Sequence, residues 1–339
     1  VDAGGYSSCF VTTNGHAYCM GYDGSGQLGT GSTGTQHSPQ QVKTGSGSYL
    51  TNVASIQMGG SSAQVVCALL KNGHVYCWGY GYYGGVGDGG SSHRHYATQV
   101  KESSGGSLKN VVTVQAGFYH ALAMKKDGSL YFWGYNGYGA SGDGKTSSVR
   151  KATKVPGKWK VPKKTKSLGV YTTPVGSSGQ GSVCAVKKSG ALYCWGMGSY
   201  GKLGTGTSST RYIPTAVLKK AKGGYFNNVT SIAMGFYHTC VALASDQLYC
   251  SGYNSYGQLG DGSKTASRAF VKSNLDNVTS VEGGGFHTCA ISDGDLYCWG
   301  YNGHGQIGDG TKTIRLVPTR AKLKGGGYLT NVVSLACGY

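Results

Sequence analysis

One sequence pattern occurs six times along the 339 residues of this chain. Its clearest copy reads CAISDGDLYCWGYNGHGQIGDG and runs from Cys289 to Gly310. Each copy has two residues that bracket a tight turn, then an aromatic segment and a glycine-rich loop. The period is roughly 50 to 60 residues, which indicates a repeat architecture rather than a series of unrelated elements. This repeat constrains the fold more than any other feature of the chain.

Each copy divides into four short segments with the character of β-strands. The first follows an Asn-Val step, the second has the form HTCAIS, and the third has the form LYCWGY. A glycine loop follows, and a looser fourth segment such as VPTRAKL returns the chain. Four antiparallel strands per copy, repeated radially, predict the blades of an all-β protein, a β-propeller.

The bracketing residues are symmetric about their turns, as opposed residues of a hairpin must be. The last pair centres on Asp293-Gly294, a strong signal for a two-residue type I′ turn. Four other pairs centre on a three-residue loop with glycine in its third place, where a left-handed residue is needed. In the fifth copy Asp246 stands at this place. The pairs are Cys9–Cys19, Cys67–Cys77, Leu122–Phe132, Cys184–Cys194, Cys240–Cys250 and Cys289–Cys298.

We predict one β-propeller domain over residues 1–339. A basic insertion at 145–182 separates the third and fourth copies. The chain's end repeats the strand position of its start, so six copies and the first strand of a seventh are expected, in a six- or seven-bladed propeller. Because the chain opens at Val1 in mid-repeat, we expect it to be a piece of a longer protein. The repeats cover residues 1–52, 53–110, 111–166, 167–228, 229–277 and 278–331, and the next begins at 332–339.

Ten of the eleven cysteines form the five bracketing cysteine pairs. Cys337 is left unpaired, and the alternatives for it are a bond within a seventh blade, a bond to another chain, or a role as a small buried hydrophobic residue. The third copy loses both cysteines together, as Leu122 and Phe132, which indicates that the two sulfurs of a pair act on each other. Opposed residues in an antiparallel pair have Cα atoms ~4.5 Å apart, a separation that suits a disulfide. Buried free thiols and a metal site are the alternatives, although the C-x2-C spacing of many zinc sites does not occur. Five disulfides favour an oxidising compartment.

The charge is strongly basic, with 31 Lys plus Arg against 13 Asp plus Glu and a formal net charge of +18. A positive field attracts acidic proteins, acidic polysaccharides, nucleic acids or anionic headgroups. No apolar run reaches the 18 residues of a membrane span. The scarcity of acids disfavours a two-carboxylate hydrolase. Because no catalytic or nucleotide-binding motif stands in a convincing context, we expect a non-enzymatic protein without cofactor or metal.

The basic insertion supplies the candidate contacts for an anionic partner. Lys145 and Arg150 precede the group, and a solvated loop is the simpler interpretation of such a segment. Aromatic and basic residues together are typical of polyanion-binding surfaces. The candidate residues are Lys151, Lys154, Lys158, Trp159, Lys160, Lys163, Lys164 and Lys166.

Tyrosine is abundant, at 26 residues, and many tyrosines fall on the loops between strands. They form either a contact surface for protein or sugar, or simply the packing of glycine-rich blades. The tyrosines concerned are Tyr80, Tyr82, Tyr83, Tyr135, Tyr138, Tyr253, Tyr256 and Tyr301.

Other residue types recur once per copy, which favours structural roles. The recurrent aspartates of the GDG loops resemble calcium ligands, but their long period favours side-chain-to-backbone turns. His93 and His95 form an isolated HxH, a weak metal signal. The recurrent residues are His120, His238 and His287 before strand two, Asp88, Asp143, Asp261 and Asp309 in the loops, and Trp78, Trp133, Trp195 and Trp299 after strand three.

The pattern GxxHTCAL…DGxLYCWGxNxxGQLGDG resembles the repeat of the regulator of chromosome condensation family, and the resemblance covers nearly the whole chain. It implies a β-propeller, commonly of seven blades. The nuclear member of the family acts as a guanine-nucleotide exchange factor in a reducing compartment, and the cysteine pairs disfavour that role here. Secreted propellers that resemble the family include protein inhibitors.

We therefore expect an extracellular or cell-surface binding or adhesion scaffold that recognises a protein or acidic surface polymer, within a larger surface protein or appendage. Self-association through the unpaired terminal strand is a further expectation, and nucleic acid is a less favoured partner. Alternatives are a chromatin- or small-GTPase-binding propeller and a secreted protein inhibitor.

Overall fold

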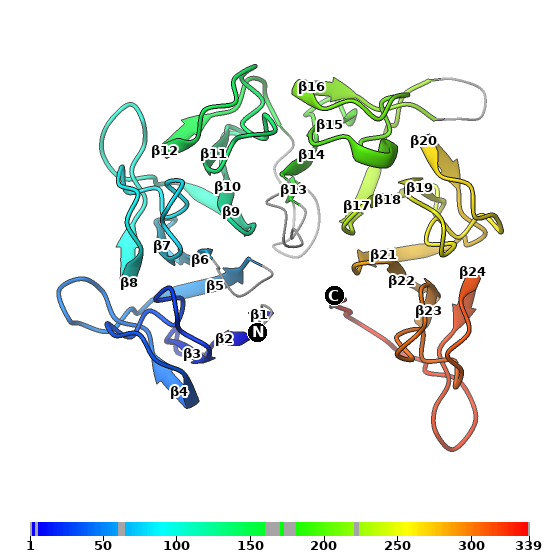
Figure 1. Cartoon of the computed structure of the whole chain (residues 1–339), viewed down its shortest axis with the longest axis horizontal. Helices are drawn as coiled ribbons and strands as arrows, with labels where there is room; N and C mark the ends of the chain where they lie inside the picture. The colour runs from blue at the N-terminus through cyan, green and yellow to red at the C-terminus, as the bar shows by residue number, and fades with distance from the viewer. Residues whose placement is uncertain are drawn as a thin grey trace. The chain divides into compact units, whose positions relative to one another are not determined.

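The computed structural model describes residues 2–3, 6–59, 65–159, 170–172, 181–219 and 224–337. In these ranges the secondary structure consists of β-strands and one short 3-10 helix, η1 (Ser199–Gly201). The strands form six four-stranded antiparallel sheets, one for each copy of the repeat, and in every sheet the strands follow one another in chain order (Figure 1). The predicted all-β architecture of four-stranded blades is confirmed.

The first compact unit comprises residues 1–161 and 174–181 and contains three sheets. The first sheet consists of β1 (Asp2–Ala3), β2 (Ser7–Val11), β3 (Ala17–Gly21) and β4 (Gln36–Gln41). The second consists of β5 (Val53–Met58), β6 (Val65–Leu70), β7 (Val75–Gly79) and β8 (Arg94–Gln99). The third consists of β9 (Val111–Ala116), β10 (His120–Lys125), β11 (Leu130–Gly134) and β12 (Val149–Lys154).

The second compact unit comprises residues 162–173 and 182–339 and contains the other three sheets. The fourth sheet consists of β13 (Val170–Thr172), β14 (Ser182–Val186), β15 (Leu192–Gly196) and β16 (Arg211–Ala216). The fifth consists of β17 (Val229–Met234), β18 (His238–Leu243), β19 (Leu248–Gly252) and β20 (Ser267–Lys272). The sixth consists of β21 (Val278–Gly283), β22 (His287–Ser292), β23 (Asp295–Gly300) and β24 (Arg315–Arg320).

The central hairpin of each sheet has the predicted register. Cys289 lies opposite Cys298, and Leu122 lies opposite Phe132 in the copy without cysteines. Asp293 and Gly294 have φ of 50° and 81°, as a type I′ turn requires. Asp246 accepts the left-handed conformation predicted for its position, with φ of 63°. Local turn chemistry therefore determines which residues face each other across the hairpin.

All five predicted cysteine pairs are disulfides. They join Cys9 to Cys19, Cys67 to Cys77, Cys184 to Cys194, Cys240 to Cys250 and Cys289 to Cys298, each with Cα atoms 4.1 Å apart. Each bridge closes a short loop, for which the chain-entropy model gives a stabilisation of roughly 2.5–3 kcal/mol. Five of the hairpins are therefore stabilised by a disulfide in addition to side-chain packing.

Within each compact unit, neighbouring sheets pack on one another through apolar clusters. One such cluster contains Cys9 and Cys19 of the first sheet together with Ile56 and Trp78 of the second. The indole Nε1 of Trp78 donates to the backbone oxygen of Gln27 at 2.9 Å, and Trp299 makes the same bond to Gln258. The four recurrent tryptophans are fully buried. The predicted role in packing between blades is confirmed for Trp78, Trp133 and Trp299, each of which shares an apolar cluster with the preceding sheet.

The segment 332–337 differs from the prediction, because it is not a β-strand. The first strand of each blade takes its backbone hydrogen bonds from the second strand of the same blade. Within 332–337 the described structure shows one backbone hydrogen bond, from Val332 N–H to the oxygen of Gly294 at 2.8 Å. Leu335 and Cys337 instead pack on Cys289 and the sixth sheet. Self-association through this segment stays a prediction.

The predicted insertion at 145–182 also differs from a simple interruption of the repeat. Residues 149–154 form β12, the regular fourth strand of the third sheet, paired with β11. Residues 170–172 form β13, the first strand of the fourth sheet. The remainder at 160–169 and 173–180 lies outside the described residues.

Candidate functional site

Aromatic side chains gather at the loops where the second and third strands of a blade lie side by side. In the third blade, Tyr119 precedes β10 and Tyr135 follows β11, and Tyr135 N–H donates to the oxygen of Tyr119 at 2.8 Å. His120 lies opposite Gly134 at this end of the hairpin. Because the strand ends are paired, the adjoining loops bring their aromatic residues together.

In the first compact unit these residues form a continuous set, which we call the first aromatic surface. It contains Tyr80, Tyr82, Tyr83, Tyr119, Tyr135 and Tyr138. The ring centroids of Tyr80 and Tyr119 lie 4.9 Å apart, as do those of Tyr83 and Tyr135. Tyr82 is 65% exposed, and the other members are half-buried. The surface therefore joins packed rings to at least one freely accessible ring.

The second compact unit repeats this arrangement in a second aromatic surface. It contains Tyr200, Tyr237, Tyr253, Tyr256, Phe286 and Tyr301. The centroids of Tyr200 and Tyr237 lie 5.1 Å apart, as do those of Tyr256 and Tyr301. Tyr200 is 49% exposed and has a left-handed backbone, with φ of 61°. The same register thus creates an aromatic surface in each unit.

Three phenol groups of the first surface, those of Tyr80, Tyr119 and Tyr135, have pKa values above the ordinary one and stay uncharged at physiological pH. Burial raises the pKa of Tyr80, and the neighbouring phenols of Tyr119, Tyr83 and Tyr82 raise it further. Burial and Tyr83 likewise raise the pKa of Tyr119, and burial, Tyr138 and Tyr83 raise that of Tyr135. A neutral tyrosine offers both an apolar ring face and a hydroxyl that donates and accepts hydrogen bonds. Such residues are enriched in protein–protein interfaces.

The eight tyrosines named from the sequence all belong to these two surfaces. The structure adds Tyr119, Tyr200, Tyr237 and Phe286, which sequence reasoning missed. Tyr119 and Tyr237 belong to a recurrent Phe-Tyr-His step, and Phe286 precedes the corresponding histidine. Aligning the copies at this step would have found three of the four.

The basic candidates are only partly brought together. Lys145, Arg150, Lys151, Lys154 and Lys158 are exposed on and beside β12. Lysine on the outer strand of a sheet also discourages pairing with other chains, which is a sufficient structural reason for it. The candidates Lys160, Lys163, Lys164 and Lys166 lie outside the described residues. Binding by this group stays a prediction.

The predicted contact through Trp159 needs a correction, because its ring is not on the surface. Trp159 is 2% exposed. Its backbone N–H donates to the oxygen of Gly128 at 3.0 Å, which fixes the segment against the third hairpin. Lysines flank Trp159 in the sequence, but its ring is buried because the backbone hydrogen bond to Gly128 holds this segment against the third hairpin.

The recurrent aspartates act as turn residues, as predicted. Asp88, Asp261 and Asp309 each accept a hydrogen bond from the backbone N–H two residues on, at 2.9–3.0 Å. Burial opposes ionisation of Asp309, but hydrogen bonds from Thr311 and the Arg315 guanidinium outweigh it and lower its pKa to about 2. Asp143 accepts the corresponding bond at 3.1 Å.

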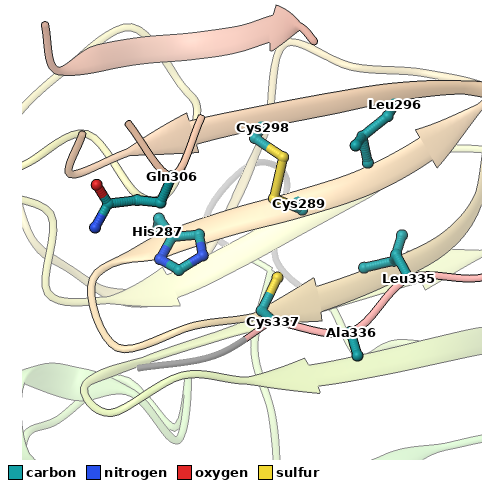
Figure 2. Close-up of a pocket in the computed structure, with 8 residues that line it drawn as sticks. All are labelled: His287, Cys289, Leu296, Cys298, Gln306, Leu335, Ala336 and Cys337. Carbon is teal, nitrogen blue, oxygen red and sulfur yellow. A yellow bond between two sulfur atoms is a disulfide. The ribbon is translucent and has the colours of Figure 1, made fainter. Parts of the chain in front are cut away.

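A pocket of about 340 Å³ lies against the sixth sheet (Figure 2). It is lined by His287, Cys289, Leu296, Cys298, Gln306, Leu335, Ala336 and Cys337. A ring nitrogen of His287 and the sulfurs of Cys289 and Cys337 all lie within 4.8 Å of one another. Zinc is held by three or four protein ligands. Because Cys289 is bridged to Cys298, its sulfur is not a thiolate, and this group supplies two ligands rather than three.

Comparison with known families agrees with the repeat pattern. The family model described as the RCC1-like domain matches residues 1–339. The chain belongs to this family. The ultraviolet-B receptor UVR8 of Arabidopsis thaliana is 30% identical over 281 residues, which are 79% of this chain and 57% of UVR8. The human E3 ubiquitin-protein ligase HERC2 is 31% identical over 297 residues, 86% of this chain but 6% of HERC2. The chain thus spans about half of UVR8 and a small part of HERC2.

Solved structures show the same fold at lower sequence identity. Human WBSCR16 superposes with a TM-score of 0.74 and 21% identity, over 99% of this chain and 84% of that one. Prp20p of Saccharomyces cerevisiae gives 0.72 and 20%, over 99% and 79%. These similarities establish the β-propeller fold of the RCC1-like domain. No helix in the described ranges is long and apolar enough to cross a membrane.

Proposed function

We propose that this RCC1-like chain is a non-enzymatic scaffold that binds a protein partner through its two aromatic surfaces. The observation that carries the proposal is the clustering of twelve aromatic rings at equivalent loops of the two units, with Tyr82 and Tyr200 strongly exposed. Exposed tyrosines beside partly buried ones match the composition of interface cores, where a few aromatic anchors provide most of the binding energy.

The family supports a binding role. Yeast Prp20p binds Gsp1p and histones, and yeast RCC1 (Prp20) has also been crystallised with Kap60 bound to it. For the present chain, the net charge of +18 favours an acidic partner. Five disulfides support an oxidising location, so the proposed scaffold works outside the cell or on its surface, where adhesion is its role. A chromatin- or GTPase-binding role and a protein-inhibitor role are the alternatives.

The test compares variants of the aromatic surfaces on one set of probes. An array of secreted and cell-surface proteins is screened with the full chain in buffer of physiological ionic strength, and dissociation constants of any binder are measured by interferometry. We expect Tyr82→Ala and Tyr200→Ala to weaken the interaction at the surface used by about ten-fold or more. Binding that both variants leave unchanged would contradict the proposal.

Matched controls are available in each unit. Tyr49 and Tyr212 are 54% and 45% exposed, and neither belongs to an aromatic surface. Tyr49→Ala and Tyr212→Ala should leave the dissociation constant unchanged. An equal loss in these controls would show that the effect comes from general destabilisation rather than from the aromatic surfaces.

An anionic surface polymer is the second candidate, because Arg150, Lys151, Lys154 and Lys158 are exposed and form no ion pair within the described residues. Heparin serves as the probe, at several salt concentrations. Lys151→Ala, Lys154→Ala and Lys158→Ala together should reduce both the affinity and its salt dependence. The matched control replaces Lys312, Lys322 and Lys324, which are exposed elsewhere. If both triple variants lost the same heparin affinity, the binding would be nonspecific charge attraction and not a property of the lysines at β12.

A further inference from the structure

We propose that Cys337, His287 and the Cys289–Cys298 disulfide form a site for intramolecular thiol–disulfide exchange, in which the free thiol displaces Cys298 from the bridge. The proposal does not depend on the binding role proposed above. It rests on the pocket at the sixth sheet, where a thiol, an imidazole and a disulfide face one another (Figure 2).

The repeat itself places the Cys337 side chain beside a bridge. Cys337 stands six residues after Asn331, and the same position holds Met58, Ala116 and Met234 in other copies. Each of these residues packs in the same apolar cluster as the disulfide of the preceding blade. The pairs are Met58 with Cys9–Cys19, Ala116 with Cys67–Cys77, and Met234 with Cys184–Cys194. Cys337 follows this rule against Cys289–Cys298, and it is the member with a reactive atom.

The atoms that would react are already close together. The sulfurs of Cys337 and Cys289 and a ring nitrogen of His287 lie within 4.8 Å of one another. Figure 2 shows the Cys337 sulfur directed toward Cys289, with the His287 ring beside both. The Cys337 thiol donates to the backbone oxygen of Glu282 at 3.8 Å, a long contact that the thiol can give up. A short movement of segment 332–337 therefore brings the sulfurs into contact.

This bridge is also more open than the other four. Cys289 is 7% exposed and Cys298 is 2% exposed, whereas the cysteines of the other bridges are at most 1% exposed. The pocket of about 340 Å³ adjoins both sulfurs. A displaced Cys298 side chain therefore has space to move away from the new bond.

His287 is placed to accept the thiol proton. It is 7% exposed, and within the described residues its ring makes no hydrogen bond, whereas the equivalent His238 bonds to the Thr288 hydroxyl at 2.9 Å. Burial lowers the pKa of His287, so its imidazole is neutral at physiological pH and has a lone pair available. A buried polar ring without a partner, directed into the pocket, is the second observation that supports a site.

The exchange conserves atoms and electrons without any added oxidant. The Cys337 proton passes to a His287 nitrogen, and the resulting thiolate attacks the Cys289 sulfur. The Cys337–Cys289 bond forms while the Cys289–Cys298 bond breaks, and its electron pair leaves on Cys298. The Cys298 thiolate then takes the proton from His287. One disulfide and one thiol are present before and after, and segment 332–337 is now covalently tied to β22.

The surroundings also keep the exchange slow at neutral pH. Burial raises the pKa of Cys337 to about 12, with a further contribution from the Glu282 carboxylate and an opposing one from the Cys289 backbone hydrogen bond. Since the thiolate is the attacking species, direct ionisation of the thiol adds a second route that grows with pH, and the exchange should be faster at pH 9 than at pH 7. Glu282→Gln should lower the pKa and accelerate the exchange.

The test follows the position of the free thiol in the full, unreduced chain. Samples are incubated at pH 7 and pH 9, quenched in acid, alkylated with N-ethylmaleimide in denaturant at pH 6, digested without reduction and mapped by mass spectrometry. We expect the label to move from Cys337 to Cys298, with a new Cys289–Cys337 peptide, faster at pH 9. A label that stays on Cys337 alone at both pH values would overturn the proposal.

Two variants separate proximity from chemistry. In Cys298→Ser, the thiols of Cys289 and Cys337 should join on mild oxidation with glutathione disulfide, and two thiols that persist would show that the sulfurs do not meet. In His287→Gln, the exchange should slow by about ten-fold or more. An unchanged rate would remove His287 from the site.

A matched control uses the same repeat position elsewhere. Met234→Cys, in a Cys337→Ser background, sets one free thiol beside Cys184–Cys194, where Ser182 occupies the place of His287. We expect its exchange to be at least about ten-fold slower than that of Cys337, because this location has no imidazole. Equal rates would contradict the assigned role of the pocket.

Discussion

Asp23 in the first blade and Asn302 in the sixth accept the same hydrogen bond, but only the asparagine also donates. Oδ1 of Asp23 accepts from Leu28 N–H at 2.8 Å, and Oδ1 of Asn302 accepts from Ile307 N–H at 3.0 Å. The Asn302 amide nitrogen donates to the carbonyl oxygens nine and eleven residues on. Asp23 is fully buried, and its Oδ2 has no partner within the described residues. The first blade therefore has a buried acceptor at a donor's position.

We predict that Asp23→Asn stabilises the protein, and more so at pH 7.5 than at pH 4. Burial raises the pKa of Asp23 to about 6, above its ordinary 3.8, while the Leu28 backbone bond opposes the shift. A raised carboxyl pKa means that the folded state prefers the protonated form. The stability that the protonated Asp23 carboxyl contributes to the folded state is fully present below pH 3.8 and is lost as the pH rises through 6. The loss is at most about 3 kcal/mol, measured as the free energy of unfolding in urea.

The reverse exchange in the sixth blade is the control for this prediction. Asn302→Asp should destabilise the protein and introduce a loss of stability with rising pH. If Asp23→Asn gave the same urea midpoint as the parent at pH 7.5, the buried carboxylate would not cost what the geometry implies.

Lys202 is the second polar side chain buried at an unfavourable position. It is fully buried, and its amine donates to the Phe236 backbone oxygen at 3.3 Å. Burial lowers the pKa of Lys202 from 10.5 to about 7. Other copies have glutamine at this position, at Gln27, Gln258 and Gln306. Lys202 thus places an amine at a buried position where these other copies have an uncharged side chain.

We predict that Lys202→Gln stabilises the protein at pH 6 by at least about 1 kcal/mol. The depressed pKa means that the stability associated with this amine is complete above pH 10.5 and is lost as the pH falls through 7. Lys188→Gln, at an exposed lysine of the same sheet, should have no effect. Thermal unfolding at pH 6 and pH 9 measures both. If Lys202→Gln stabilised the protein as much at pH 9 as at pH 6, burial of the charged amine would not be the cause of the stabilisation.

Gly128 and Gly190 occupy equivalent turn positions but meet different surroundings. Both have positive φ, of 79° and 91°. A Cβ at Gly128 would lie 2.5 Å from the Trp159 oxygen, whereas one at Gly190 would lie 3.6 Å from its nearest neighbour, Asn228 N. Alanine at Gly190 should cost roughly 1–2 kcal/mol for the backbone alone. Gly128→Ala should cost distinctly more, because the clash with the Trp159 segment is added to this strain.

Chemical denaturation of the two alanine variants tests the difference. Equal losses would show that the Trp159 backbone does not rest on the turn as described. This comparison also tests the structural role of Trp159 without altering any lysine of the basic group.

Much of each blade follows from sequence alone, because hairpin register depends on local chemistry. The spacing of Cys289 and Cys298 about Asp293-Gly294 determines the turn and hence the residues that face each other. The joint replacement by Leu122 and Phe132 then identified the bridges. Both inferences require only the alternation of strands and the preferences of a turn.

Features that depend on distant contacts were not predictable in the same way. Trp159 is buried because its backbone N–H donates a hydrogen bond to the oxygen of Gly128, 31 positions earlier in the chain (159 − 128). The substitutions at Asp23 and Lys202 are visible in aligned copies, but only the fold shows that both side chains are buried. Segment 332–337 carries a strand signal, yet backbone pairing decides whether a strand forms.

The most direct measurement maps the free thiols among the eleven cysteines of residues 1–339, peptide by peptide, in the protein isolated from its native source without reductant. These residues contain five disulfides, so denaturation and alkylation should label one of the eleven cysteines, Cys337 or, after exchange, Cys298. Full reduction should raise the count to eleven. Eleven labelled cysteines before reduction would contradict both the five disulfides and the proposed oxidising location.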